Sequence, residues 1–330
     1  MSERSNLVLQ TLLLAGKILL LTVLLFVCFA VGAQVSRVGE IADDASVAEV
    51  PSKVEPGSAE PDKPVGSKTA RSAQMLFTLL VVCLVNTLVI AFLVLRSRWT
   101  GLRLAATVAL VFYGSMTLMP QIEVAVFLGA EELVRKSLLM GAVIVAPFSA
   151  LAVLVLGRMR RGETHLDAGV RLRLPLHEWI WKGAAGALTY VALYLTFGYF
   201  IAWQNPALRE LYGGSEPEGF LALMQSSVMS WLLPLQTLRG ALWILLALPM
   251  IRMMKGHWLE AGLAVGLSFA VLMNSQLLLP NPLMEESVRM THLAETASSN
   301  FLFGLVIAWL FRRRHPRGPG EGKGRDDAHT

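Results

Sequence analysis

The sequence predicts an all-α, polytopic membrane helix bundle of about eight transmembrane helices. Of its 330 residues, 54% are hydrophobic and only 16% are charged, whereas a soluble domain is typically about 25% charged. The hydrophobic residues gather in runs of roughly 17–24 residues, each long enough to cross a hydrocarbon core of about 30 Å as a helix. None of the runs alternates between polar and apolar residues as a barrel strand would.

Each predicted span is an apolar run bounded by polar or charged residues. Backbone groups in lipid must find hydrogen-bond partners within their own segment, so every span is expected to be helical. The predicted spans are residues 10–33, 74–95, 103–120, 137–157, 183–203, 234–251, 258–279 and 291–311.

The chain divides into four parts. Residues 1–33 form the first transmembrane helix, an uncleaved anchor, because the apolar run is longer than the 7–15 residues typical of a signal peptide. Residues 34–72 contain four prolines and scattered acids without apolar periodicity, so we expect a disordered extracytoplasmic loop. Residues 73–314 form a seven-helix membrane bundle, and residues 315–330 form a disordered cytoplasmic tail.

The distribution of charge predicts the orientation. With the N-terminus inside, 19 of the 29 Lys and Arg residues fall in inner segments, whereas 16 of the 24 acids fall in outer ones. Cytoplasmic loops of membrane proteins carry an excess of Lys and Arg. We therefore expect a multi-pass protein of the cell inner (plasma) membrane with both termini cytoplasmic. Attraction of the basic loops to anionic lipid accounts for the net charge of +5, so no nucleic-acid partner is implied.

Three segments beside the spans are expected to lie along the membrane. Residues 172–182 combine Trp179 and Trp181 with charges, which favours an interfacial lead-in. Residues 219–233 precede Pro234, and the apolar run that continues to residue 251 is too long for one span. We interpret 219–233 as an outer interfacial or re-entrant helix. Residues 121–136 are too apolar for a solvated loop and predict a short helix that dips into the outer leaflet.

A stripe of polar residues runs along one face of the last span. Arg289, His292, Glu295, Thr296 and Ser299 are spaced by three or four, which places them on the same side of a helix. Such a stripe cannot face lipid, because a charge at a helix centre costs about 2.5–3.5 kcal/mol on insertion scales. His292 and Glu295 are within reach of each other. The pair could be a helix-packing patch or a proton-handling or substrate-contacting site, unless the span starts deeper and His292 lies in the loop.

Polar residues recur at the same outer depth on other helices. Glu131 and Glu132 can pair with Arg135 by helical spacing, either as a solvated ion pair or as part of a site. Arg239 could extend to the headgroups or pair with Glu131, Glu132 or Glu295. This coincidence predicts a polar pocket open to the outside. Its candidate catalytic residues are His292, Glu295, Glu131 and Glu132, and its candidate substrate-binding residues are Arg239, Arg135, Gln236, Asn300, Asn274 and Arg209.

The sequence lacks the residues that several known kinds of catalytic site require. There is no His-Glu-x-x-His motif, and the two cysteines lie inside spans, so neither a metal nor another cofactor is expected. The Glu131-Glu132…Arg135 and His292…Asn300 fragments resemble the CAAX-protease and bacteriocin-processing family of membrane metalloproteases. That family has its Glu pair and Arg one residue further apart and two separate His motifs. The second His motif is absent here, so membership is not predicted.

Three function classes remain. The first is a protein that processes or binds a lipid or lipid-linked substrate at the outer leaflet, with Glu and His as acid and base and Arg as anion ligand. The second is a proton-coupled transporter. The third is a non-catalytic membrane subunit or assembly factor. The expected partners are membrane lipids and a lipid or small molecule from the extracytoplasmic side, and enzymatic activity stays undetermined.

Overall fold

The computed structural model describes residues 3–38, 66–160, 174–211, 219–226, 228–280 and 284–313. Within these ranges all regular secondary structure is helical. One isolated antiparallel bridge joins Ser97 to Met254. Eight helices of this described part are long and apolar enough to cross a membrane. The predicted all-α polytopic bundle is thus confirmed, and the chain is a multi-pass membrane protein.

Six of the spans are single helices and two are composite. The single helices are α1 (Glu3–Ser36), α3 (Gly66–Arg96), α6 (Glu131–Val155), α7 (Leu176–Phe200), α10 (Val228–Met253) and α12 (Glu286–Arg312). The third span joins α4 (Gly101–Tyr113), the π-helix η1 (Gly114–Leu118), α5 (Met119–Glu123) and the π-helix η2 (Val124–Leu128). The seventh joins α11 (Trp258–Leu267), the π-helix η4 (Ser268–Leu272) and the 3₁₀ turn η5 (Ser275–Leu278). Short elements are η3 (Ala202–Gln204), α8 (Pro206–Leu211) and α9 (Phe220–Gln225).

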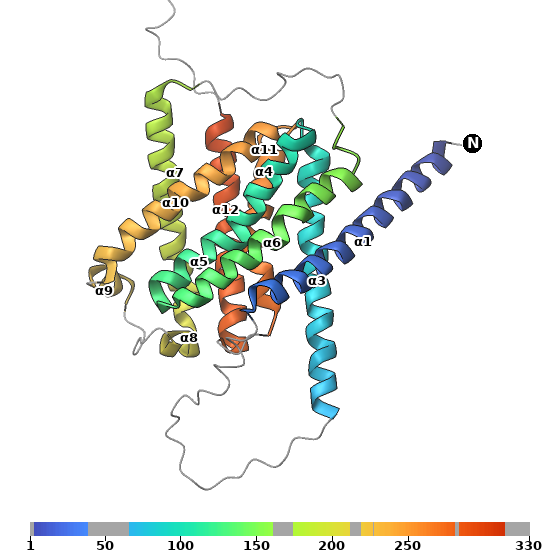
Figure 1. Ribbon diagram of the computed structural model, residues 1–330. Coiled ribbons are helices and arrows are strands. Elements are labelled where there is room, and N and C mark those ends of the chain that lie inside the picture. Colours follow the sequence, from blue (N-terminus) through green and yellow to red (C-terminus); the bar gives the residue numbers. More distant parts are fainter. Residues whose placement is uncertain are drawn as a thin grey trace, which may run out of the picture.

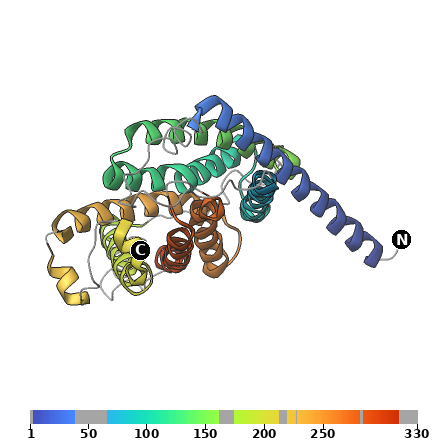
Figure 2. The same ribbon diagram turned by 90° about the horizontal axis from the view of Figure 1, so that it is seen from below.

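The helices form two groups with α10 between them (Figures 1 and 2). On one side α1 packs on α6 and α3, and α6 packs on α4. On the other side α12 packs on α11 and α7, and α10 contacts both α7 and α4. The core between the groups includes Trp243 of α10, whose ring lies 4.2 Å from that of Phe269 in η4. Helix α10 therefore carries residues that face both groups.

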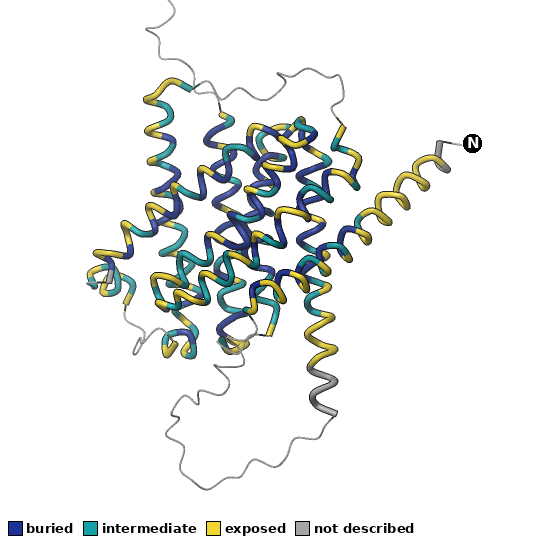
Figure 3. Tube along the Cα trace, viewed as in Figure 1, coloured by how far each residue is buried: buried dark blue, intermediate teal, exposed yellow. Residues whose placement is uncertain are grey.

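Two helices extend beyond this packed region. Residues 6–17 of α1 and residues 72–77 of α3 are exposed over the whole circumference of the helix (Figure 3). The exposed residues of α1 are mainly large hydrophobic ones such as Leu12 and Leu19. A helix with this surface is suited to lipid on all sides.

The third span is longer than predicted. Its helix continues without a break to Phe127 instead of ending at 120, because the apolar residues Val124–Leu128 extend it. Gly129 then reverses the chain at a φ of 60°, a conformation that suits glycine, and α6 begins at Glu131. The predicted separate helix over 121–136 is therefore wrong. Its first half belongs to one span and its second half to the next.

The fifth and sixth spans also begin earlier than predicted. Helix α7 starts at Leu176, so its residues up to 182 are part of the spanning helix and not a separate interfacial segment. Lys182 is fully buried there and forms an ion pair of 2.9 Å with Glu178. Residues 219–233 do not form one helix: α9 is followed by the first turns of α10, which contains Pro234.

Two further boundaries lie inside the predicted loop, and two predicted segments lie outside the described part. Helix α1 continues to Ser36 and α3 begins at Gly66, so both extend into the predicted loop. The middle of that loop, residues 39–65, and the tail of 315–330 are not among the described residues.

The C-terminal ends of four spans meet at one end of the bundle. Arg158, which follows α6, donates hydrogen bonds to the carbonyls of Ser97 (2.5 Å) and Trp99 (3.3 Å) beyond α3. Arg312 of α12 donates to the carbonyls of Ile251 (2.8 Å) and Met254 (2.7 Å) at the end of α10. These side chains satisfy carbonyl groups that a helix end leaves without partners.

Candidate functional site

A small polar cavity lies where α5, α7, α10 and α12 meet. Its volume is about 20 Å³, which is room for roughly one water molecule. Its polar lining includes Glu123, Tyr190, Tyr194, Arg239, Glu295 and Asn300. Three of the predicted site residues, Arg239, Glu295 and Asn300, therefore share one cavity.

The cation of this cavity is neutralised by an acid. The Arg239 guanidinium donates to the Glu123 carboxylate and, at 2.9 Å, to the side-chain oxygen of Gln236. Arg239 is only 1% exposed, whereas the Glu123 side chain is 31% exposed. The predicted partners Glu131, Glu132 and Glu295 are wrong, because the third span continues past residue 120 and carries Glu123 to α10.

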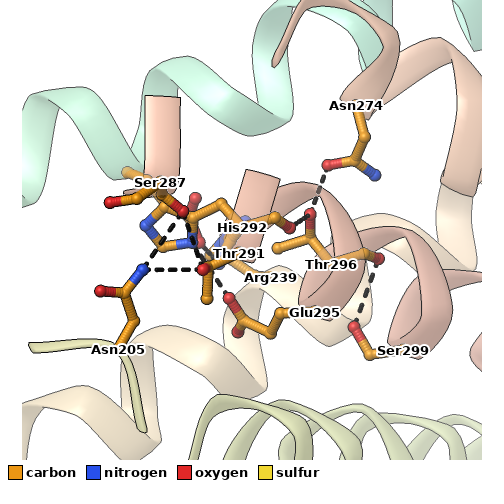
Figure 4. Close-up of polar contacts among 10 residues, drawn as sticks. Asn205, Arg239, Asn274, Ser287, Thr291, His292, Glu295, Thr296 and Ser299 are labelled. Atoms are coloured by element: carbon orange, nitrogen blue, oxygen red, sulfur yellow. Dashed lines mark hydrogen bonds and ion pairs between the residues drawn. The ribbon is translucent and has the colours of Figure 1, made fainter. Parts of the chain in front are cut away.

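His292 and Glu295 form a second pair of ionisable residues, of which Glu295 lines the cavity. The Nδ1 atom of His292 lies 3.0 Å from Oε2 of Glu295 (Figure 4). The Glu295 side chain is 6% exposed and that of His292 is 19% exposed. Because α12 begins at Glu286, six residues before His292, the alternative that places His292 in a loop is excluded.

Three further polar residues of α12 bind the seventh span, whereas the Ser299 hydroxyl donates to the Thr296 carbonyl of α12 itself. Arg289 donates to the carbonyls of Leu277 (2.9 Å) and Leu279 (2.6 Å) at the end of η5. The Thr296 hydroxyl lies within hydrogen-bond distance of the Asn274 side-chain oxygen (Figure 4). The Asn300 amide donates to the sulfur of Met273 at 3.2 Å. Arg289 and Asn274 therefore fix the seventh span against the eighth rather than facing the cavity.

Four predicted residues lie apart from the cavity. Glu131, Glu132 and Arg135 are exposed on the first turns of α6, and Glu132 pairs with Lys136 at 3.2 Å instead of with Arg135. Glu131 and Arg135 form no ion pair with each other in this described helix. Arg209 of α8 donates to the Trp203 carbonyl at 2.7 Å. The tight turn at Gly129 directs the start of α6 outward, which separates these acids from Arg239.

Two side-chain amides bind carbonyls of π-helical segments. The Gln276 amide donates to the Met116 carbonyl in η1 at 3.2 Å. The Asn274 amide donates to the Ala270 carbonyl in η4 at 2.9 Å. A π-turn interrupts the regular backbone ladder and is frequent at functional sites. Both segments lie in the two composite spans, so the helix irregularities and the polar cavity occur in the same part of the bundle.

Sequence reasoning overlooked three residues of the cavity. Glu123 is the sole acid in the run of residues 101–128, and this was the signal that could have identified it. Tyr190 and Tyr194 come from one face of α7, and tyrosines in an apolar span carry no comparable signal. The phenol of Tyr190 is buried beside Arg239, whose guanidinium carbon lies 5.9 Å from the ring centroid.

The comparisons with known proteins give no relative. No protein-family model, curated protein or solved structure matches the chain. Among the described residues no group of three or more His, Cys, Asp or Glu side chains could hold a metal ion. The chemistry of the cavity therefore has to be inferred from its own side chains.

Proposed function

We propose that this chain is a proton-handling membrane protein, with the His292–Glu295 pair as the group that takes up and releases the proton. The observation that carries the proposal is the position of Glu295, which lines a water-sized cavity and lies 3.0 Å from His292, while the buried cation of that cavity is balanced by Glu123. Ionisable groups buried within membrane spans commonly form proton relays. In this proposal the protein lies in the inner membrane, and the cavity receives protons from the extracytoplasmic side.

The proposed step is a proton transfer between two neighbouring side chains. His292 is the more exposed of the two and takes up the proton on its imidazole. Its Nδ1–H bond then breaks as an O–H bond forms on Oε2 of Glu295, 3.0 Å away. The products are a neutral imidazole and a neutral carboxylic acid, so no net charge remains on the pair. Neutral groups are far less costly than ions within a span.

The composite helices favour a transport function for the proton uptake. Transporters commonly place binding sites beside discontinuous helices. The cavity residues of the third and seventh spans, Glu123 and Met273, directly adjoin the π-helical segments η2 and η4 in the chain. Further buried polar atoms, Nδ2 of Asn86 and Oγ of Ser115, have no hydrogen-bond partner among the described residues. Such atoms in native proteins usually bind ordered water, which could carry protons.

Lipid processing at the outer leaflet is supported less well by the same geometry. A phosphate-bearing headgroup would need an available cation, but Arg239 is paired with Glu123. It would also need a far larger volume than about 20 Å³. An enzyme of this class would therefore require a conformation in which the ion pair is open. A non-catalytic subunit needs neither protonation nor a cavity.

Proton movement can be measured directly. The purified protein is reconstituted into vesicles that contain a pH-sensitive dye, and valinomycin imposes a potassium diffusion potential. We expect faster internal acidification than in protein-free vesicles, and loss of this excess in Glu295→Gln. The control is Glu286→Gln, the same change at an exposed position of α12, which should behave as wild type. A Glu295→Gln protein that acidifies vesicles as fast as wild type would contradict the proposal.

A further inference from the structure

A cluster of cations lies at the end of the bundle where α3, α6, α10 and α12 end (top of Figure 1). We call it the basic cluster, and it comprises Arg96, Arg98, Arg158, Lys255 and Arg312. None of these residues lines the polar cavity. The cluster is thus a second polar feature, separate from the proton-handling site.

Backbone contacts between adjacent connections assemble the basic cluster. Arg98 donates to the Lys255 carbonyl at 2.7 Å, and the Lys255 amide donates to the Arg96 carbonyl at 3.2 Å. Arg158 and Arg312 bind carbonyls of the same two connections. The positions of the cations are therefore fixed by the fold and do not depend on flexible loops.

Among the described residues, the basic cluster carries more positive charge than nearby acids balance. Glu260 forms an ion pair of 2.7 Å with Arg96. Lys255 is exposed, and its ammonium group has no hydrogen bond or ion pair within the described part of the chain. Desolvation, followed by the charges of Arg158 and Arg96, lowers the pKa of Lys255. Its amino group thus lies in a field that favours an added anion.

The surroundings of the basic cluster match the boundary between headgroups and lipid chains. Trp99 and Trp258, half-buried at the ends of two spans, are residues typical of that boundary. The guanidinium of Arg103 lies 3.7 Å above the Trp99 ring. In the first turn of α4 and of α11, Leu102 is 78% exposed and Leu259 is 48% exposed. An anion with attached acyl chains would therefore contact both charge and apolar surface.

We propose that the basic cluster binds the phosphate headgroup of an anionic phospholipid from the leaflet at this end of the bundle. The phosphate oxygens accept hydrogen bonds from the Lys255 ammonium, and the acyl chains lie along the exposed leucines of α4 and α11. The proposal is independent of the proton-handling function, because the two sites share no residue.

Native mass spectrometry of the detergent-purified protein tests this proposal. Phosphatidylglycerol and phosphatidylcholine with the same acyl chains are titrated separately, and the apparent affinity for the first bound lipid is compared. We expect tighter binding of phosphatidylglycerol, weakened about fivefold in Lys255→Gln and retained in Lys255→Arg. Arg252→Gln is the matched control, since Arg252 is exposed on the same helix end and forms no ion pair with a described residue.

Three results would overturn the proposal. The first is equal affinity of the wild-type protein for the two lipids. The second is a Lys255→Gln variant that binds phosphatidylglycerol as tightly as wild type. The third is displacement of phosphatidylglycerol by millimolar inorganic phosphate, which would assign the basic cluster to a free anion. Lys255 is exposed, so its substitution should leave folding intact, and an unchanged thermal transition checks this.

Discussion

Glu123 and Arg239 lie 116 positions apart in the sequence, yet their side chains form an ion pair at the wall of the cavity. The pair joins the third span to the sixth, and hence one group of helices to the other. Its two members differ in environment, because Arg239 is fully enclosed while about a third of the Glu123 side chain is exposed. This difference in burial determines which residue can be left unpaired with the smaller loss of folding free energy.

We expect Glu123→Gln to destabilise the protein more than Arg239→Met. The first change leaves a buried guanidinium without its carboxylate, and an unpaired buried charge costs about 3–5 kcal/mol. The second leaves without its partner a carboxylate that is not fully buried, so its cost should be smaller, on the order of 1–2 kcal/mol. Thermal or denaturant unfolding in detergent measures both.

The double variant provides the control for this pair. With both charges removed, stability should return to about that of Arg239→Met alone. Additive losses would mean that the two side chains act independently and that their ion pair has no energetic role.

His292→Asn and Glu295→Gln should separate function from packing. Both substitutions preserve size and hydrogen bonding, and a side-chain hydrogen bond in a membrane protein contributes on the order of 0.6 kcal/mol. Expression and thermal stability should therefore stay close to wild type while proton flux falls. If both variants keep full flux in vesicles, the pair serves only to pack α12.

Gly304→Ala should weaken the contact between α11 and α12. A Cβ atom at Gly304 would overlap the backbone of Gly266, so the two helices would have to separate. Overpacking of this kind typically costs about 1–3 kcal/mol. In the control Gly183→Ala, the added methyl group meets no atom within 4 Å, and stability should not fall. Equal unfolding temperatures for the two variants would contradict this close approach.

Lys255 should react faster with amine-directed reagents than Lys136. Partial desolvation and the guanidinium groups of Arg158 and Arg96 lower the pKa of Lys255. A larger fraction of its amine is therefore neutral and nucleophilic at a pH below the ordinary lysine pKa of about 10.4. Limited acetylation at mildly alkaline pH followed by peptide mass spectrometry measures the ratio. Added phosphatidylglycerol should slow the labelling of Lys255, and slower labelling than Lys136 in its absence would contradict the effect.

Topology reporters test the orientation. The excess of Lys and Arg in the inner connections predicts that a fusion after Gly318 is cytoplasmic and that an insertion near Pro56 is extracytoplasmic. An externally active reporter at Gly318 would invert the orientation and place the cavity on the opposite side.

The spans were predictable because lipid imposes a length and an apolar composition on any helix that crosses it. All eight predicted runs overlap spanning helices in the described structure. The stripe from Arg289 to Ser299 was predictable for a related reason, since its spacing of three or four places it on one face and lipid excludes that face. Both properties are local to a single helix.

The partner of Arg239 was not predictable in this way. Identifying it required knowing that the third span continues past Pro120, whose ring cannot donate a backbone hydrogen bond and which usually indicates a boundary. The π-helical segments that precede and follow α5 have no sequence signature. Which helix faces α10 depends on packing among distant spans, and periodicity within one run contains no such information.

The packing of α1 against α6 has a consequence for biosynthesis. Gly32 of α1 lies against the Ile144 side chain of α6, so the main binding surface for α1 is synthesised about a hundred residues after it. Until then, we expect α1 to pack on α3 in the bilayer, while the apolar surface that α6 later covers faces lipid. Docking of α1 would then mark a late stage of maturation, after the third and fourth spans have entered the membrane.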